Sequence, residues 1–124
     1  MTWQKLLVVA LGGALGASLR YLISSAPFPT LISIPLGTLA VNMLGGFAIG
    51  FIMGLAPKTG MDDTARTFLT TGIMGGLTTF STFSNETYTL FAEGSFMLGG
   101  VNIIANLAGA LCACWIGHTL VHMF

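Results

Sequence analysis

The segment 72–89 carries most of the residues in this sequence that could bind an ion. It combines Gly75 and Gly76 with a run of hydroxyl side chains and two phenylalanines. Glycine and threonine are poor helix formers, so we expect a local break near 75–79. A break exposes backbone carbonyls, which are tolerated in a membrane only with protein, water or ions as partners. Carbonyl oxygens suit hard cations such as Na⁺, so a buried cation site is conceivable, while a hydroxyl-stabilised kink without an ion is the simpler explanation of the composition.

The two phenylalanines of this segment could contribute to an anion site. Phe80 and Phe83 lie three residues apart, hence on one helix face, with Ser81 and Thr82 between them. Aromatic ring edges carry partial positive charge, and hydroxyls and the amide of Asn42 are hydrogen-bond donors. Such groups could replace water around a small anion without a fixed cation that would trap it. On spacing alone, packing is the commoner role for a pair of phenylalanines.

The elements that position these residues must lie in a membrane. Only 6% of the 124 residues are charged, whereas 54% are hydrophobic. Charge-free runs cover 21–57, 67–85 and 94–124. A membrane-spanning helix needs about 20 apolar residues, so the chain accommodates about four spans and no further soluble domain. With four basic residues and zero net charge, nucleic acid is excluded as a partner.

Turn-forming residues divide the chain into four predicted helices. Three prolines interrupt the first apolar region, and 57–63 and 93–95 are polar. We expect one transmembrane domain, 1–124, with helices at about 3–24, 35–56, 64–92 and 96–122, the third broken near 75–79. Three of the four Lys and Arg residues then fall on one side of the membrane, which is weak information about orientation.

Small residues recur at every fourth position on the predicted helices. Such stripes allow close helix packing in lipid and argue against a wide aqueous channel within one subunit. The stripes consist of Gly12 and Gly16; Gly46, Gly50 and Gly54; and Ala105, Gly109, Ala113 and Gly117. Asn42 shares the second stripe, and Asn102 and Asn106 share one face of 96–122. Amides at that depth need hydrogen-bond partners.

Three motifs resemble the Fluc (CrcB) family of fluoride ion channels. They read GGALGASLRY at 12–21, GTLAVNMLGG at 37–46 and GIMGGLTTFSTFS at 72–84. The resemblance implies an all-α membrane protein with four transmembrane helices, assembled as a dual-topology antiparallel homodimer. It also implies fluoride pathways along the interface and a central structural Na⁺ at that interface.

Carried over by position, the resemblance assigns the Na⁺ to the backbone carbonyls of Gly75 and Thr78 from each subunit. It assigns the fluoride pathway to Asn42, Phe80 and Phe83, with Ser81 and Thr82 as a hydroxyl track.

The resemblance also covers Arg20, which matches an arginine of the family, and Asn106, which departs from it. Arg20 corresponds to an arginine that attracts anions at a vestibule or anchors the helix end. Asn106 falls in the fluoride pathway where members place a larger polar or aromatic side chain.

The resemblance implies a passive fluoride-selective channel in the bacterial plasma (inner) membrane, and not an enzyme. Its partners would be fluoride, a second copy of the chain and the lipid bilayer. One alternative is a small proton-coupled multidrug exporter, which needs a membrane-embedded carboxylate. The acids, Asp62, Asp63, Glu86 and Glu93, all lie near predicted helix ends or loops. A second alternative is a non-transporting membrane assembly subunit, which has no need of the hydroxyl and phenylalanine segment.

Overall fold

The computed structural model describes residues 1–29 and 33–124, and all regular elements in these two ranges are helices. The all-α prediction is therefore confirmed for the described residues. The elements are α1 (Trp3–Ser24), α2 (Leu36–Thr59), α3 (Asp63–Thr67), the π-helix η1 (Phe68–Met74), α4 (Gly75–Leu77), α5 (Phe80–Ala92) and α6 (Phe96–His122). The middle of the predicted loop between the first two helices, 30–32, lies outside the described residues.

Helix α2 extends further than its sequence predicts. The predicted end at Ala56 is wrong, because the helix continues through Pro57 to Thr59. A proline this close to the end removes one backbone hydrogen bond without forcing the chain out of the helix. The helix instead ends at Gly60, whose φ of 64° is the left-handed conformation that favours glycine.

The segment after α2 is interrupted, as its composition predicts, but the interruption begins later than Gly75. Gly75 is helical, with φ −61° and ψ −35°. The extended residues are Thr78 (φ −83°, ψ 157°) and Thr79 (φ −146°, ψ 115°). Thr79 caps the following helix α5, because its hydroxyl oxygen accepts a 3.1 Å hydrogen bond from Thr82 N. The wide turns of η1 have no counterpart in the predicted helix 64–92.

Three helices in the described ranges are long and apolar enough to cross a membrane. These are α1, α2 and α6. The interrupted segment does not meet this length criterion, since the break leaves 13 residues in α5. By length and composition, the structure therefore supports a multi-pass membrane protein with three continuous spans.

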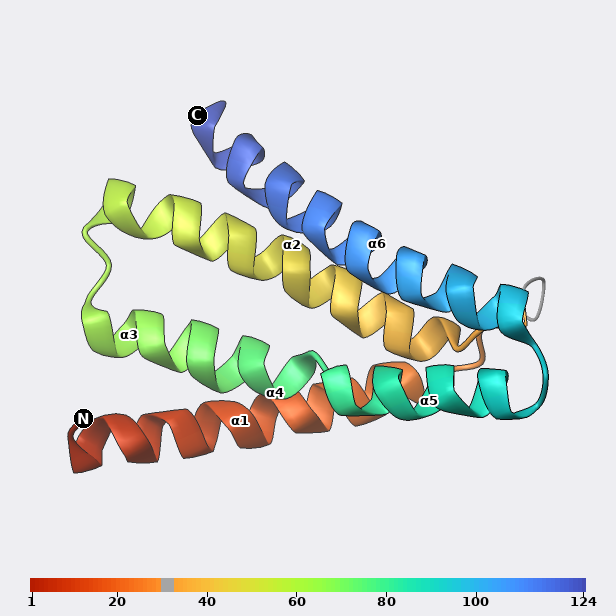
Figure 1. The fold of residues 1–124 in the computed structure, drawn as a ribbon. Coiled ribbons are helices and arrows are strands. Elements are labelled where there is room, and N and C mark those ends of the chain that lie inside the picture. Colours follow the sequence, from red (N-terminus) through yellow and green to blue (C-terminus); the bar gives the residue numbers. More distant parts are fainter. Residues whose placement is uncertain (30–32) are drawn as a thin grey trace.

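The helices form two pairs that the interrupted segment connects (Figure 1). Helix α2 packs along α6, while α1 packs along η1 and α4. Beyond the break, α5 contacts α6. The break thus carries one segment from its place beside α1 to the α2–α6 pair. Both termini lie at the end of the molecule that holds the turn after α2 (Figure 1).

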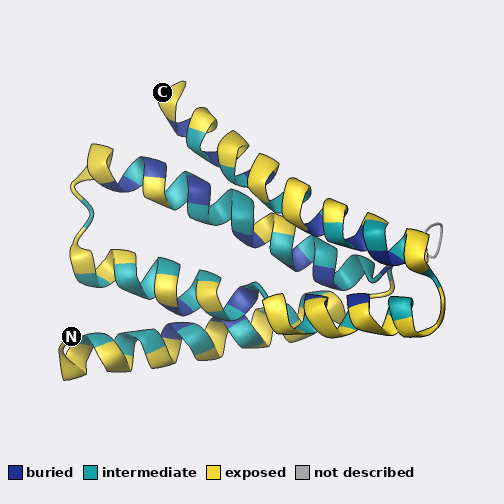
Figure 2. Ribbon diagram, in the orientation of Figure 1, coloured by how far each residue is buried: buried dark blue, intermediate teal, exposed yellow. Residues whose placement is uncertain are grey.

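Small residues let the paired helices touch through their backbones. A Cβ atom on Gly12 would lie 2.8 Å from the Cα of Gly72, and one on Gly16 would overlap the carbonyl of Ile73. On the other pair, a Cβ on Gly50 would overlap the carbonyl of Cys114. The buried residues follow these contact faces, and the outward faces are exposed (Figure 2). The predicted role of the glycine stripes in close packing is confirmed at these positions.

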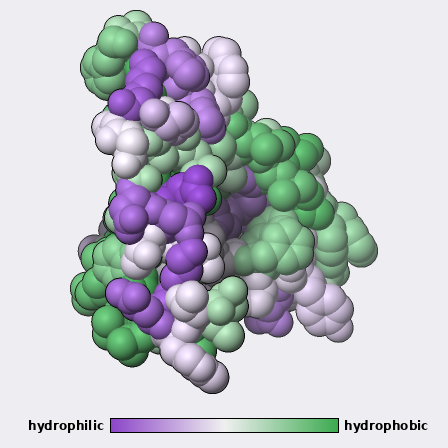
Figure 3. Space-filling model, turned by 90° about the vertical axis from the view of Figure 1, so that its left-hand side faces the viewer, coloured by the Kyte–Doolittle hydropathy of each residue, from purple (hydrophilic) through white to green (hydrophobic). Residues whose placement is uncertain are grey.

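Charged side chains gather at the end that holds both termini. Asp63 forms ion pairs with Lys5 and with Arg66, the latter at 2.6 Å. Lys58 donates a 2.9 Å hydrogen bond to the carbonyl of Val121 in the last turn of α6. Seen from this end, hydrophilic residues form a band beside hydrophobic surface (Figure 3). Such a face suits a membrane–water boundary.

Candidate functional site

The break before α5 is held by the side chain of Asn42 from α2. Asn42 Oδ1 accepts a 2.8 Å hydrogen bond from Thr79 N, and Asn42 Nδ2 donates a 3.3 Å bond to Thr79 O. One amide therefore pairs with both backbone groups of an extended residue. A residue outside regular structure needs such partners where water is scarce.

Two carbonyls at the break lose the donors that a continuous helix would give them. In a helix, Thr79 N would donate to Gly75 O, but it donates to Asn42 Oδ1. Likewise Thr82 N would donate to Thr78 O, but it donates to the Thr79 hydroxyl. The carbonyls of Gly75 and Thr78 are thus released from the helical pattern together.

The carbonyl of Gly76, between these two residues, has a different partner. Arg20 on α1 donates from Nε to Gly76 O at 2.9 Å. The guanidinium therefore ties α1 to the helical turn that precedes the break. This contact supports the anchoring role for Arg20, which the sequence left open beside an electrostatic one.

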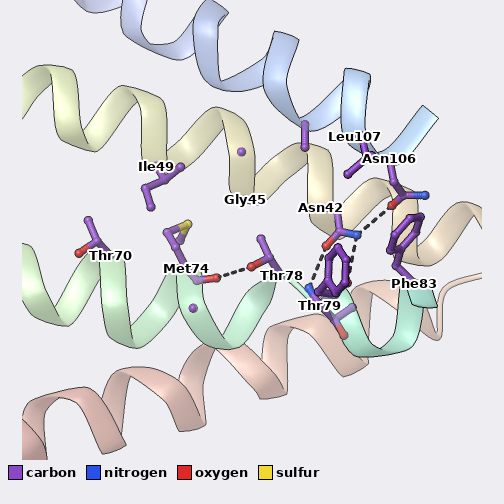
Figure 4. Close-up of a pocket in the computed structure, with 14 residues that line it drawn as sticks. Asn42, Gly45, Ile49, Thr70, Met74, Thr78, Thr79, Phe83, Asn106 and Leu107 are labelled. Atoms are coloured by element: carbon purple, nitrogen blue, oxygen red, sulfur yellow. Dashed lines mark hydrogen bonds between the residues drawn. The ribbon is translucent and has the colours of Figure 1, made fainter. Parts of the chain in front are cut away.

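A groove of about 330 Å³ opens beside the break, between α2 and α6 on one side and η1, α4 and α5 on the other (Figure 4). Most of its lining is apolar. The predicted site residues along it are Asn42, Gly75, Thr78, Phe80, Phe83 and Asn106. In this groove Asn42 Nδ2 donates a 2.8 Å hydrogen bond to Asn106 Oδ1 (Figure 4). Six residues from three separate stretches of sequence are therefore brought to one surface.

The two phenylalanines of the groove differ in exposure. Phe83 is buried, whereas 72% of Phe80 is exposed. Their ring centroids lie 5.4 Å apart, with the planes tilted by 58°. A tilted pair turns ring edges in different directions, so one edge can face a ligand while the other packs.

The two residues of the predicted hydroxyl track, Ser81 and Thr82, lie in different places in the structure. Thr82 does not line the groove but a second cavity of about 340 Å³, together with Arg20 and Glu86. Ser81 is exposed and lies in neither lining, although its hydroxyl is 3.4 Å from that of Thr79. Thr79 lines both cavities and so separates them.

Glu86 is placed differently from what the sequence suggests. It lies within α5 rather than at a helix end, it is only partly exposed, and its Oε1 is buried without a hydrogen-bond partner among the residues that the structure describes. The expectation that Glu86 lies near a helix end is therefore wrong, because α5 extends from Phe80 to Ala92 and holds Glu86 in its middle.

Three residues beyond the predicted set contribute to the site. Thr79 forms the break itself, while Asn102 and Thr87 lie behind Asn106 and are buried. Asn102 has a signal in the sequence, because it shares a helix face with Asn106. Thr87 has none, since a threonine at that position fits any helix.

The donors around the groove are uncharged, which determines what the site can bind. Amide N–H groups and ring edges suit an anion held weakly, and released carbonyls suit a hard cation. Within 1–29 and 33–124, no three His, Cys, Asp or Glu side chains are placed to hold a metal ion.

Comparison with known proteins gives one consistent family. The family described as CrcB-like protein, Camphor Resistance (CrcB), matches residues 7–118. A protein of Clostridium perfringens named fluoride-specific ion channel FluC is 49% identical over 97% of this chain and 98% of its own length. Proteins of the same name from Campylobacter fetus and Methanococcus vannielii are 45% and 39% identical, each over 98% of this chain and over 96% and 98% of their own lengths.

Proposed function

This chain belongs to the CrcB family, and on that premise we propose that it is a fluoride-selective channel through which fluoride leaves the cytoplasm passively. The observation that carries the proposal is the groove in which the amide of Asn42 and the rings of Phe80 and Phe83 meet. A channel must offset the dehydration of its ion without holding it. Uncharged donors do this, whereas a lysine or arginine in the same place would retain the anion.

The comparisons also decide between a channel and an enzyme. The relatives with nearly full-length matches are named as ion channels. We accordingly regard this chain as a multi-pass membrane protein that conducts an ion and catalyses no reaction. A location in the plasma (inner) membrane of a bacterium is part of the same proposal.

Fluoride efflux from liposomes tests this function. Purified protein is reconstituted into liposomes loaded with potassium fluoride, valinomycin is added without a pH gradient, and external fluoride is recorded with an electrode. We expect rapid fluoride release and no comparable release from chloride-loaded liposomes. Release that requires a pH gradient would contradict a passive channel and indicate proton coupling, for which Glu86→Gln is the informative variant. Absence of release would contradict the channel and leave the multidrug exporter and the assembly subunit.

We further propose that the segment 64–92 crosses the membrane as a fourth, broken span and that two copies assemble antiparallel. The groove supports this assembly, because its lining includes exposed Gly75, whose carbonyl is released from its helical partner and finds no hydrogen-bond donor in lipid. Lys5, Lys58 and Arg66 at one end against Arg20 towards the other give only a weak bias towards one orientation.

Cysteine labelling in intact cells tests the two orientations. Cys112 and Cys114 are first replaced by alanine, since both are free thiols. Thr59→Cys then places one exposed thiol at the end of α2. We expect partial labelling from outside and completion only after permeabilisation. Labelling from one side alone would contradict dual topology.

We also propose that the carbonyls of Gly75 and Thr78 hold a structural Na⁺ where two copies meet. The fit rests on the donor set: both carbonyls are released from the helical pattern, and oxygen ligands suit this cation. One chain supplies two such oxygens, and a second copy would supply the same two. Bound Na⁺ would neutralise their partial negative charge at the centre of the assembly.

Thermal unfolding of the purified protein tests the cation site without any transport assay. We expect a higher midpoint in sodium than in N-methylglucamine buffer of equal ionic strength, because a ligand that binds only the folded state stabilises it. Thr78→Ala keeps the carbonyl and should retain the difference. Equal midpoints in both buffers would refute the sodium site.

A further inference from the structure

A chain of side-chain hydrogen bonds continues from the groove into the protein. Asn106 Nδ2 donates to Asn102 Oδ1 at 3.2 Å and to Asn102 O at 2.9 Å. Asn102 Nδ2 donates to Thr87 Oγ1 at 2.9 Å, and Thr87 Oγ1 donates to Phe83 O at 2.8 Å. Together with the bonds of Asn42 to Thr79 and Asn106, these bonds form one hydrogen-bond chain. It starts at Thr79, at the break before α5, passes through α2 and α6, and ends in α5.

The two ends of this chain set its direction. Thr79 N–H can only donate and Phe83 O can only accept, so every group between them must donate towards Phe83. Each asparagine therefore has one allowed amide orientation. Reversing one amide would bring two N–H₂ groups or two carbonyls together in a buried place, which is costly.

Asn102 and Thr87 are well placed to enforce that orientation. Asn102 is 1% exposed and Asn106 is 3% exposed, so neither amide has water as an alternative partner. The Thr87 hydroxyl gives its proton to Phe83 O and can therefore only accept from Asn102. Asn102 Oδ1 consequently faces Asn106, and Asn106 Oδ1 faces Asn42.

The orientation determines which atoms of Asn42 are available to a ligand in the groove. Asn42 Oδ1 is directed to Thr79 N, which leaves the N–H₂ group beside Asn106. The second N–H bond of Asn42, to Thr79 O, is 3.3 Å long and the weakest in the set. An anion could replace that bond while the bond to Asn106 stays intact.

We propose that Asn102 and Thr87 are positioning residues for fluoride passage, which they support by fixing the amide of Asn106 and, through it, the N–H₂ group of Asn42. This inference rests on the proposed channel function. Neither residue lines the groove, and neither would touch the ion. They act by keeping N–H rather than carbonyl oxygen available on the anion path.

The test compares Thr87→Val with a matched control on the same helix. Thr87→Val keeps the shape of the side chain but can no longer accept from Asn102. Thr89→Val is the control, because Thr89 makes the same local bond, to Asn85 O at 2.9 Å, and is exposed. Losing one buried hydrogen bond on the path should lower fluoride efflux about tenfold in Thr87→Val. Thr87→Ser and Thr89→Val should stay near the unchanged protein.

A spectroscopic measurement separates positioning from general destabilisation. The chain has four asparagines, and Asn85 is exposed and outside the hydrogen-bond chain. In protein labelled with ¹⁵N-asparagine, Thr87→Val should shift the side-chain amide signals of Asn102, Asn106 and Asn42 and leave that of Asn85. Thr87→Ala, with Thr89→Ala as its control, replaces the pair if Thr87→Val is not recovered as folded protein.

The outcomes distinguish this inference from the channel proposal. If Thr87→Val releases fluoride as fast as Thr89→Val, or if the Asn42 signal does not move, the positioning role is refuted while the channel stands. If the unchanged protein releases no fluoride, the channel proposal is refuted, and with it any role in passage.

Discussion

The side-chain oxygen of Asn42 accepts a 2.8 Å hydrogen bond from the backbone N–H of Thr79, 37 residues further along the chain. This bond joins α2 to the break before α5. It satisfies a donor that neither a helix nor water would satisfy there, and it releases the carbonyl of Gly75 from its helical partner. The same side chain is thus part of the fold and part of the proposed anion path.

The first prediction concerns these two roles of Asn42. Asn42→Ala should lower fluoride efflux and also destabilise the protein by about 1 to 3 kcal/mol, because Thr79 N–H loses its partner. Asn42→Asp keeps the oxygen that accepts from Thr79 but points a second oxygen, in place of the N–H₂ group, at the acceptors Asn106 Oδ1 and Thr79 O, so it should also destabilise the protein and conduct poorly. Efflux from liposomes is measured beside recovery on size-exclusion chromatography. An Asn42→Asp channel with normal efflux would remove the amide from the anion path.

The second prediction separates the two phenylalanines. Phe80 is 72% exposed in one chain, so Phe80→Leu should leave the fold of each chain intact while it lowers efflux by removing a ring edge. Phe83 is buried, so Phe83→Leu should also lower the free energy of unfolding, by about 1 kcal/mol. Efflux and thermal unfolding are measured for both variants. Normal efflux in a well-folded Phe80→Leu protein would mean that this ring serves only in packing.

The third prediction concerns the contact between Gly45 and the break. A Cβ atom on Gly45 would overlap the methyl Cγ2 of Thr78. Gly45→Ala should therefore displace Thr78 and lower both efflux and the sodium-dependent rise in unfolding midpoint. Thr78→Ser removes the methyl group, so the double variant should recover both. Gly100→Ala is the matched control, because a Cβ at that helical glycine meets no atom of residues 1–29 or 33–124 within 4 Å.

The fourth prediction concerns pH and the ion pairs at the end that holds both termini. The hydrogen bond from Lys5, and then that from Arg66, holds the pKa of Asp63 below its ordinary value of 3.8. A lowered carboxylate pKa stabilises the fold above the unfolded value and loses this effect as the pH falls through the folded value. Stability should therefore decrease as the pH drops below about 3.8. The decrease should be small, because exposed ion pairs contribute little.

Thermal unfolding in detergent at a series of pH values checks this. Asp63→Asn should reduce the part of the acid sensitivity that Asp63 supplies. Asp62→Asn is the control, because Asp62 forms no ion pair with any described residue, although it caps α3. Equal acid sensitivity in the unchanged protein and Asp63→Asn would contradict the assignment.

Features that depend on local composition could be predicted from the sequence. Apolar runs of about 20 residues define membrane helices whatever their neighbours. Glycines at every fourth position indicate which faces pack, and the interruption within 72–89 follows from residues that form helices poorly. The motif at 72–84 also pointed to the residues that the structure brings to one groove.

Which atoms those residues offer to a ligand depends on contacts between helices and could not be predicted from the sequence. The carbonyls of Gly75 and Thr78 are released from the helical pattern because of the side chain of Asn42 and the cap that Thr79 forms. Asn42 belongs to another helix. Thr82 lines the cavity of Arg20 and Glu86, and Asn102 donates a hydrogen bond to Thr87, because of how the helices cross. No local pattern in the sequence encodes these crossings. Hydrogen bonds between residues far apart in sequence depend on how helices are placed against one another, and periodicity along one helix carries no such information.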